Sequence, residues 1–269
     1  MLDVAGASLY YETRGHVSAP ALLLVHAGVA SLRMWDPIVP SLEGDHHVVS
    51  FDTRGFGGTR TSDDPYSDRD DARALLDHLG IPEATVVGSS RGGRIAVDLA
   101  LETPERVSGL VLVAAGISGF PDVPLTGAEQ RLARELEEAE AGQDWQRLAD
   151  LEVAFWSIGP TRTTADLDPA FVSLAQELNR ANVPHAVEQP SPVPLAPPAY
   201  GRLGELALPA LVTVGAHDVS VAQRRFEYAR DELPGAEIEV FEHSAHLPSV
   251  EQPVEFVGRL REWLGLHGL

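Results

Sequence analysis

The sequence contains no cysteine and no lysine, so all 20 of its basic side chains are arginine. Without cysteine the chain has no thiol nucleophile, no disulfide and no thiolate metal site. Without lysine it has no ε-amino group for Schiff-base chemistry. These two absences exclude several kinds of covalent catalysis before any motif is considered.

Long apolar runs and positive charge are also scarce. No apolar run approaches the roughly 18 residues of a membrane span, and the opening MLDVAGASLYYETRG lacks the basic and apolar segments of a signal peptide. The formal net charge of −20 argues against nucleic acid or an anionic membrane as a partner. We therefore expect a cytoplasmic protein with a small-molecule substrate, and a homodimer is compatible with the sequence.

Alternating strand and helix patterns predict the fold class. Apolar runs rich in Val and Leu, without polar alternation, predict strands buried on both faces. These runs are residues 21–26, 47–52, 84–89, 107–115, 208–215 and 236–243. Helical patterns alternate with them over residues 67–79, 91–103, 220–231 and 250–264. We predict an α/β fold with a mostly parallel central sheet and helices on both faces.

The strand and helix rhythm stops between residues 119 and 198. Helical stretches such as GAEQRLARELEEAEAG and DPAFVSLAQELNRAN occur there, followed by the proline-rich HAVEQPSPVPLAPP. Proline excludes a helix interior or a central strand, so this last stretch predicts an extended return segment. We predict a core made of residues 1–118 and 199–269, interrupted by one helical insertion over residues 119–198.

The stretch VVGSSRGGRIA contains two adjacent serines, and its glycines identify the nucleophile. A nucleophile elbow requires Gly-x-Ser-x-Gly between a strand and a helix, because the tight turn has no room for side chains two residues either side of the serine. Gly88 and Gly92 satisfy this spacing for Ser90, whereas the same positions around Ser89 would be Val87 and Arg91. A strand pattern precedes the motif and a helix pattern follows it, so we predict Ser90 as the nucleophile.

A serine nucleophile needs a base and an acid that orients the base. Asp218 follows the predicted strand 208–215, and His246 follows the strand 236–243. Both loops open at the carboxyl edge of a parallel sheet, where the elbow also lies. We predict the triad Ser90, Asp218 and His246, and prefer His246 over its neighbour His243.

The developing oxyanion requires two backbone N–H donors. The residue after the nucleophile, Arg91, supplies one, and Gly28 in the loop after the strand 21–26 supplies the other. We find no metal-ligand spacing and no glycine loop that would cradle a phosphate, so no metal and no cofactor is expected.

At these residues the sequence resembles the serine-nucleophile branch of the α/β-hydrolase superfamily, including its enol-lactonase-like and esterase-like members. The motifs that match are His26-Ala27-Gly28 with Trp35, Asp52-Thr53-Arg54-Gly55-Phe56-Gly57, Gly215 to Asp218, and His246 with Glu251, Pro253 and Phe256. Ala27 stands where the family usually has glycine. The resemblance implies that the helical insertion is a cap over the active site.

The resemblance implies hydrolysis of a small carboxylic ester or lactone through an acyl-enzyme intermediate. Ser90 stands where dehalogenases and epoxide hydrolases of this fold have aspartate, which argues against those activities. Alternatives are a carbon–carbon bond hydrolase and a pyruvate-eliminating synthase, which shares Ser-x-Gly-Gly-Arg with residues 90–94 but has tyrosine at the position of Ser89. A ligand sensor without catalysis is a third alternative, against which the intact triad argues.

The candidate substrate-binding residues are Trp35, Arg94, Trp156 and Arg162. Arg91 and Arg94 would either bind an acidic substrate or join a buried salt-bridge network, and helix geometry favours the network. The aromatic residues of the insertion either pack between helices or line the substrate pocket.

Overall fold

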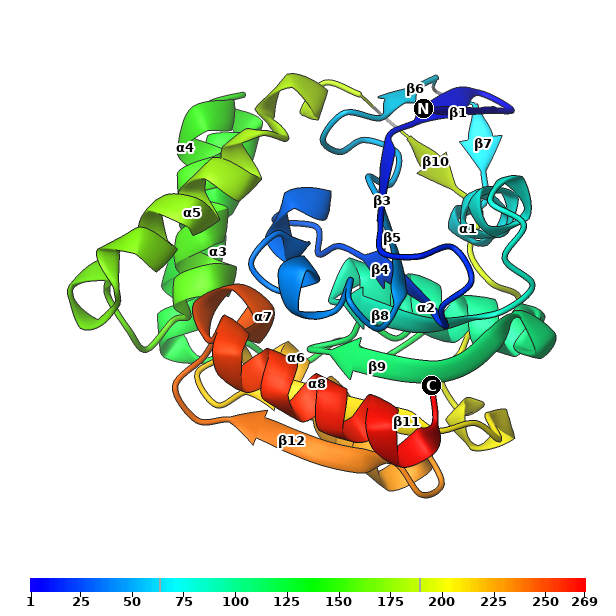
Figure 1. Ribbon diagram of the computed structural model, residues 1–269. Coiled ribbons are helices and arrows are strands. Elements are labelled where there is room, and N and C mark those ends of the chain that lie inside the picture. Colours follow the sequence, from blue (N-terminus) through cyan, green and yellow to red (C-terminus); the bar gives the residue numbers. More distant parts are fainter. Residues whose placement is uncertain (63, 189) are drawn as a thin grey trace.

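A seven-stranded sheet forms the centre of the computed structural model, which describes residues 1–62, 64–188 and 190–269 (Figure 1). The strand order is β12-β11-β9-β8-β4-β5-β3. The strands are β3 (Tyr11–Arg14), β4 (Ala21–Val25), β5 (His47–Phe51), β8 (Ala84–Ser89), β9 (Val107–Val113), β11 (Ala210–Gly215) and β12 (Glu237–Phe241). All neighbours are parallel except the edge strand β3, which is antiparallel to β5. The predicted fold class is confirmed. The strand β3 was not predicted, because its sequence YETR is short and largely polar.

Helices cover both faces of this sheet, since successive side chains of a buried strand point to opposite sides. Leu23 and Val25 of β4 belong to a core shared with α1 (Asp68–His78), α2 (Arg91–Glu102) and α6 (Ser220–Glu232). Leu22 and Leu24 belong to a second core shared with α8 (Pro253–His267). A separate short helix, α7 (Pro248–Glu251), precedes α8, so the helix predicted over residues 250–264 is two helices divided before Pro253.

The helical insertion lies beside the sheet and packs on the loops at its carboxyl edge (Figure 1). It contains α3 (Gly127–Ala141), α4 (Trp145–Glu152) and α5 (Pro169–Arg180), and α4 continues as the π-helical segment η4 (Val153–Ile158). Its proline-rich end is extended, as the sequence predicts: β10 (Ser191–Pro192) pairs in parallel with β7 (Pro65–Tyr66).

The remaining elements are short. β1 (Leu2–Val4), β2 (Ala7–Leu9) and β6 (Arg60–Thr61) form a small antiparallel sheet. The 3-10 turns are η1 (Leu32–Trp35), η2 (Val39–Ser41), η3 (Pro104–Arg106), η5 (Thr164–Asp166), η6 (Val183–His185) and η7 (Leu203–Glu205). Within the described residues, no helix has the length and apolar character needed to cross a membrane.

Candidate active site

The turn between β8 and α2 holds Ser90 in a strained backbone conformation. Its φ is 51° and its ψ is −110°, a combination that a residue with a side chain rarely adopts. The flanking glycines are required by contact: a Cβ on Gly88 would lie 2.4 Å from the Gly92 carbonyl oxygen, and one on Gly92 would lie 2.1 Å from the Val25 carbonyl oxygen. The Gly-x-Ser-x-Gly spacing of this turn thus has a direct steric basis.

Backbone hydrogen bonds keep this turn in place and distinguish the two serines. Ser90 N donates to the Val113 carbonyl at 2.8 Å, and the Ser90 carbonyl accepts from Gly116 N at 2.8 Å. Ser89 is completely buried, and its hydroxyl has no hydrogen-bond partner among the described residues. Ser90 is only half-buried. A substrate can therefore reach Ser90 and not Ser89.

Asp218 and His246 form a buried pair at the carboxyl ends of β11 and β12. His246 Nδ1 lies 2.8 Å from Asp218 Oδ2 and 3.0 Å from Oδ1. A carboxylate only accepts hydrogen bonds, so Nδ1 carries the proton and Nε2 is left as the basic nitrogen. The Trp156 ring lies over the imidazole, with 4.7 Å between centroids. The Ser90 hydroxyl makes no hydrogen bond to any described residue. In enzymes without bound substrate, the hydrogen bond between a catalytic serine and its base is often long, and it shortens when substrate binds.

Two neighbouring histidines, His243 and His217, lie outside this pair. His243 is exposed, and its carbonyl accepts a hydrogen bond from Arg162. His217 N donates to the Ser244 carbonyl at 2.9 Å, which ties the Asp218 loop to the His246 loop.

Gly28 and Arg91, the predicted oxyanion donors, are neighbours in space. A Cβ built on Gly28 would lie 4.0 Å from the Arg91 Cβ. His26 connects this loop to the loop at Thr53. Its Nε2 accepts from Thr53 N at 3.0 Å, and its Nδ1 lies 2.8 Å from the Ala27 carbonyl. These contacts define a neutral imidazole with the proton on Nδ1, in agreement with the complete burial that lowers the pKa of His26.

The two arginines after the nucleophile are held by one buried carboxylate. Arg91 donates to Asp68 Oδ1 at 2.8 Å, and Arg94 donates to Asp68 Oδ2 at 2.9 Å. The Asp68 side chain is 4% exposed, whereas the two arginine side chains are 20% and 24% exposed. Of the two alternatives weighed for these arginines, the geometry supports the salt-bridge network.

Arg162 and Trp35 do not face a substrate space. Arg162 makes a bidentate ion pair with Glu251 at 2.7 and 3.1 Å and also donates to the Ile158 and His243 carbonyls. It therefore links the insertion to the loop that carries His246. Trp35 is completely buried in the core under β4. Of the four predicted substrate contacts, only Trp156 lies against a predicted catalytic side chain.

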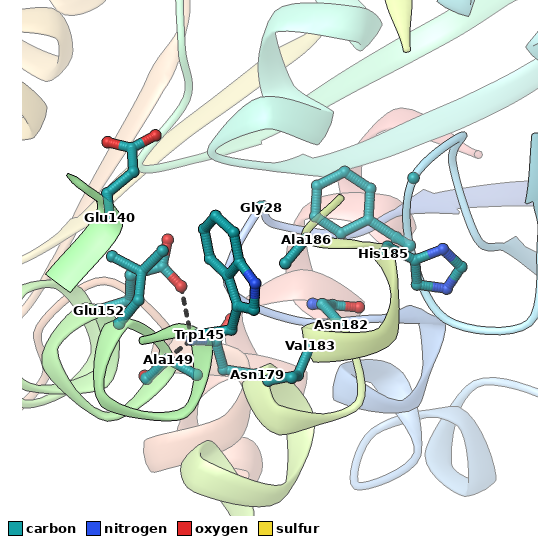
Figure 2. Close-up of a pocket in the computed structure, with 13 residues that line it drawn as sticks. Gly28, Glu140, Trp145, Ala149, Glu152, Asn179, Asn182, Val183, His185 and Ala186 are labelled. Carbon is teal, nitrogen blue, oxygen red and sulfur yellow. Dashed lines mark hydrogen bonds between the residues drawn. The ribbon is translucent and has the colours of Figure 1, made fainter. Parts of the chain in front are cut away.

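A cavity of about 230 Å³ opens between the insertion and the core beside Gly28. Figure 2 shows side chains that line it, from α3, α4, α5, η6 and the core turn at residues 55–56. Its polar and aromatic lining comprises Phe56, Glu140, Trp145, Glu152, Asn179, Asn182 and His185. Trp145, as an aromatic residue of the insertion, was expected either to pack between helices or to line the substrate pocket, and it lines this cavity. The other six were not predicted as site residues. Phe56 belongs to the motif at residues 52–57, whereas the lining residues of the insertion belong to no motif and are brought beside it by packing.

The insertion is fastened to the core around this cavity. Asn182 donates to the Ala30 carbonyl at 3.0 Å and accepts from Gly57 N at 3.2 Å. His185 Nε2 lies 2.8 Å from the Gly57 carbonyl. On the opposite side, Glu129 of α3 accepts hydrogen bonds from Ser220 N and, at 2.8 Å, from Ser220 Oγ. The insertion is thus bonded directly to the loops that carry Gly28 and Asp218.

The strained serine turn, the buried acid–histidine pair at neighbouring strand ends and the helical insertion after the strand at 107–113 define an α/β hydrolase. The chain belongs to the alpha/beta hydrolase fold family, whose model matches residues 20–253. It is similar to 3-oxoadipate enol-lactonase 2 of Acinetobacter baylyi, with 28% identity over 95% of this chain and 92% of the relative. It is also similar to carboxylesterase YbfK of Bacillus subtilis, with 29% identity over 91% of this chain and 80% of the relative.

Solved structures agree with this assignment. Est816, described as an N-acyl homoserine lactone degrading enzyme, superimposes with a TM-score of 0.74 and 25% identity, and covers 97% of this chain and 98% of its own. A hydrolase from Pseudomonas aeruginosa gives a TM-score of 0.74 at 26% identity, over 98% of this chain and 97% of its own. The chain is an enzyme of the α/β-hydrolase class.

Proposed function

We propose that this enzyme is a cytoplasmic serine hydrolase that cleaves a small carboxylic ester or lactone through an acyl-enzyme intermediate. The observation that carries the proposal is Ser90 at a positive φ on the elbow, with the Asp218–His246 pair on the adjoining loops. The named relatives, a carboxylesterase and an enol-lactonase, support this substrate class. The insertion then serves as the cap of the active site.

In the first half of the reaction, Ser90 Oγ attacks the carbonyl carbon and its proton passes to His246 Nε2. The backbone N–H groups of Gly28 and Arg91 donate to the oxyanion, and Asp218 stabilises the imidazolium. The carbon–oxygen bond to the alcohol breaks, and the alcohol leaves with the proton from His246. When the substrate is a lactone, this alcohol stays attached to the acyl group.

In the second half, water attacks the acyl carbon and gives a proton to His246 Nε2. The bond from the acyl carbon to Ser90 Oγ breaks, Ser90 recovers its proton, and the carboxylic acid is released. The adjacent serine offers a matched control, because Ser89 is buried one residue away on the same turn.

The test is hydrolysis of p-nitrophenyl acetate, butyrate and hexanoate and of a γ-lactone by the wild type, Ser90→Ala and Ser89→Ala. We expect Ser90→Ala to lower kcat by at least about 10³-fold with the fold intact by circular dichroism, and Ser89→Ala to retain activity. Full activity in Ser90→Ala would contradict the proposal. Turnover of a vinylogous 1,5-diketone without turnover of any ester would instead favour carbon–carbon bond hydrolysis.

A further inference from the structure

The cavity beside Gly28 combines aromatic rings with carboxylates. Phe56 comes from the core, and Trp145 from the start of α4. Glu140 comes from the end of α3, and Glu152 from the end of α4. In the view of Figure 2 the two carboxylates lie on one side of the Trp145 indole, and Ala186 lies on the other. The volume of about 230 Å³ is below the roughly 300–1,000 Å³ of pockets for drug-sized ligands, which suits one small chemical group.

The carboxylates of this cavity have no cationic partner in the part of the chain that the structure describes. Glu152 Oε2 accepts a single hydrogen bond, from Asn179 Nδ2 at 2.9 Å. Among the described residues, neither Glu140 nor Glu152 has an arginine or histidine nitrogen within 4.0 Å. Burial raises the pKa of Glu152, and the nearby charge of Glu140 raises it further, against the lowering effect of Asn179. A positive charge in the cavity would relieve both penalties.

Two basic side chains beside the cavity, Arg91 and His185, already have acidic partners. The Arg91 guanidinium lies 5.2 Å from the Phe56 ring centroid, but it is paired with Asp68 at 2.8 Å. His185 lines the cavity with its ring nitrogens committed, Nδ1 to Glu188 at 2.9 Å and Nε2 to the Gly57 carbonyl at 2.8 Å. Any charge that His185 gains is balanced by Glu188. The unbalanced charge in this cavity is therefore negative.

We propose that the cavity is a subsite for a positively charged, ammonium-type group of the substrate. The faces of Trp145 and Phe56 attract a cation through their ring quadrupoles, and Glu140 and Glu152 supply the opposite charge. The same charges repel a substrate that places a carboxylate there. The inference rests on the proposed function, because the cavity is a substrate subsite only if Gly28 serves the reacting carbonyl.

The catalytic test uses pairs of esters that differ by one positive charge at constant shape. Butyrylcholine is compared with 3,3-dimethylbutyl butyrate, which places the charge on the alcohol. The p-nitrophenyl ester of 4-(trimethylammonio)butyric acid is compared with that of 5,5-dimethylhexanoic acid, which places it on the acyl group. We expect kcat/KM to favour the cation at least fivefold in one pair, and the p-nitrophenyl monoester of glutaric acid to react more slowly than both acyl esters.

The variants test whether the two carboxylates cause this preference. Glu140→Gln combined with Glu152→Gln keeps an oxygen acceptor for Asn179 and removes both charges, so the preference should fall to within twofold of unity. Glu135→Gln is the matched control, because Glu135 is an exposed residue of α3 that does not line the cavity. An equal or higher kcat/KM for the uncharged ester in both pairs, or a preference unchanged in the double variant, would overturn the proposal.

A binding measurement separates failure of the subsite from failure of the proposed function. Titration calorimetry of Ser90→Ala should show choline binding at least fivefold more tightly than 3,3-dimethylbutanol, and the two charge-removing substitutions should abolish the difference. If no ester is hydrolysed but this binding difference is present, the proposed function fails and the cation site stands. Equal binding of choline and the alcohol would refute the cation site, whatever the esterase activity.

Discussion

Two groups of charges lie near Phe56, and they differ in how they are paired. In the first, which we call the Asp68 cluster, the guanidinium groups of Arg91 and Arg94 share the carboxylate of Asp68. In the second, Glu140 and Glu152 line the cavity, and no described arginine or histidine pairs with either carboxylate. A charge that is paired within the protein stabilises the fold, whereas a charge without an opposite partner is available to bind a ligand. Under the proposed function, the arginines would support the turn that carries the Arg91 N–H, and the carboxylates would bind a cationic group of the substrate.

The largest stability effect should come from breaking the Asp68 cluster. Asp68→Asn leaves the partly buried Arg91 guanidinium without an anion and leaves Arg94 with Asp98 alone, at 3.9 Å, which we expect to lower the free energy of unfolding by about 3 kcal/mol. The turn that bears the Arg91 N–H should loosen too, and kcat should fall about tenfold. Urea unfolding and ester hydrolysis measure both. Asp70→Asn, at an exposed position of the same helix, is the control and should change neither. A stable and fully active Asp68→Asn would refute the scaffold role.

The next effect concerns the ion pair between Arg162 and Glu251, whose side chains are 9% and 8% exposed. Glu251 Oε2 also accepts from Ala245 N at 3.1 Å, directly before His246. Glu251→Gln should therefore misplace the imidazole, lower kcat about tenfold and leave KM nearly unchanged.

Steady-state kinetics of Glu251→Gln and of Glu255→Gln, an exposed position on α8, measure this effect. A drop in stability with unchanged kcat in Glu251→Gln would reduce the pair to a purely structural contact.

The sequence predicts features that depend on residues close together in the chain better than features that depend on distant contacts. The turn at Ser90 depends on the spacing of Gly88, Ser90 and Gly92, and the loops that hold Asp218 and His246 follow recognisable strands. Local patterns were therefore enough to predict where these three residues lie, while their catalytic roles stay a prediction. The edge strand β3 and the division between α7 and α8 were missed because they depend on pairing and on a proline near a helix end. The cavity lining comes from three helices, one 3-10 turn and two core loops whose contacts no spacing encodes.

Low pH should remove the contribution of Glu129 to stability, because its carboxylate accepts several hydrogen bonds in the folded state. Burial alone would raise the pKa of Glu129, but hydrogen bonds from the backbones of Ser220 and Thr126 outweigh it and lower the pKa. The stabilisation is therefore present above the unfolded-state pKa of about 4.3 and is lost as the pH falls through the lower folded-state value. Glu129→Gln should cost about 1–2 kcal/mol at pH 7 and nothing near pH 2. Urea titrations at both pH values measure it, and an equal loss at both would contradict the assignment.

The stability contribution of Glu152 should depend on pH in the opposite direction to that of Glu129, and its effect should be the smallest of those predicted. Its raised pKa means that the folded state favours the protonated form, so stability present below the unfolded-state pKa is lost as the pH rises through the folded-state value. Glu152→Gln should match the wild type at pH 4 and exceed its stability by about 1 kcal/mol at pH 8. Melting curves at the two pH values test this. A less stable variant at pH 8 would indicate that the carboxylate is paired.

The most direct test of the central claim is to locate the nucleophile chemically. The wild type is treated with a fluorophosphonate, digested after arginine, and the peptide of residues 74–91 is sequenced by tandem mass spectrometry, which separates the two serines. The account predicts one phosphonyl adduct on Ser90, absent from His246→Ala under the same conditions. An adduct on Ser89, or a folded wild type that hydrolyses esters without any adduct on Ser90, would contradict it.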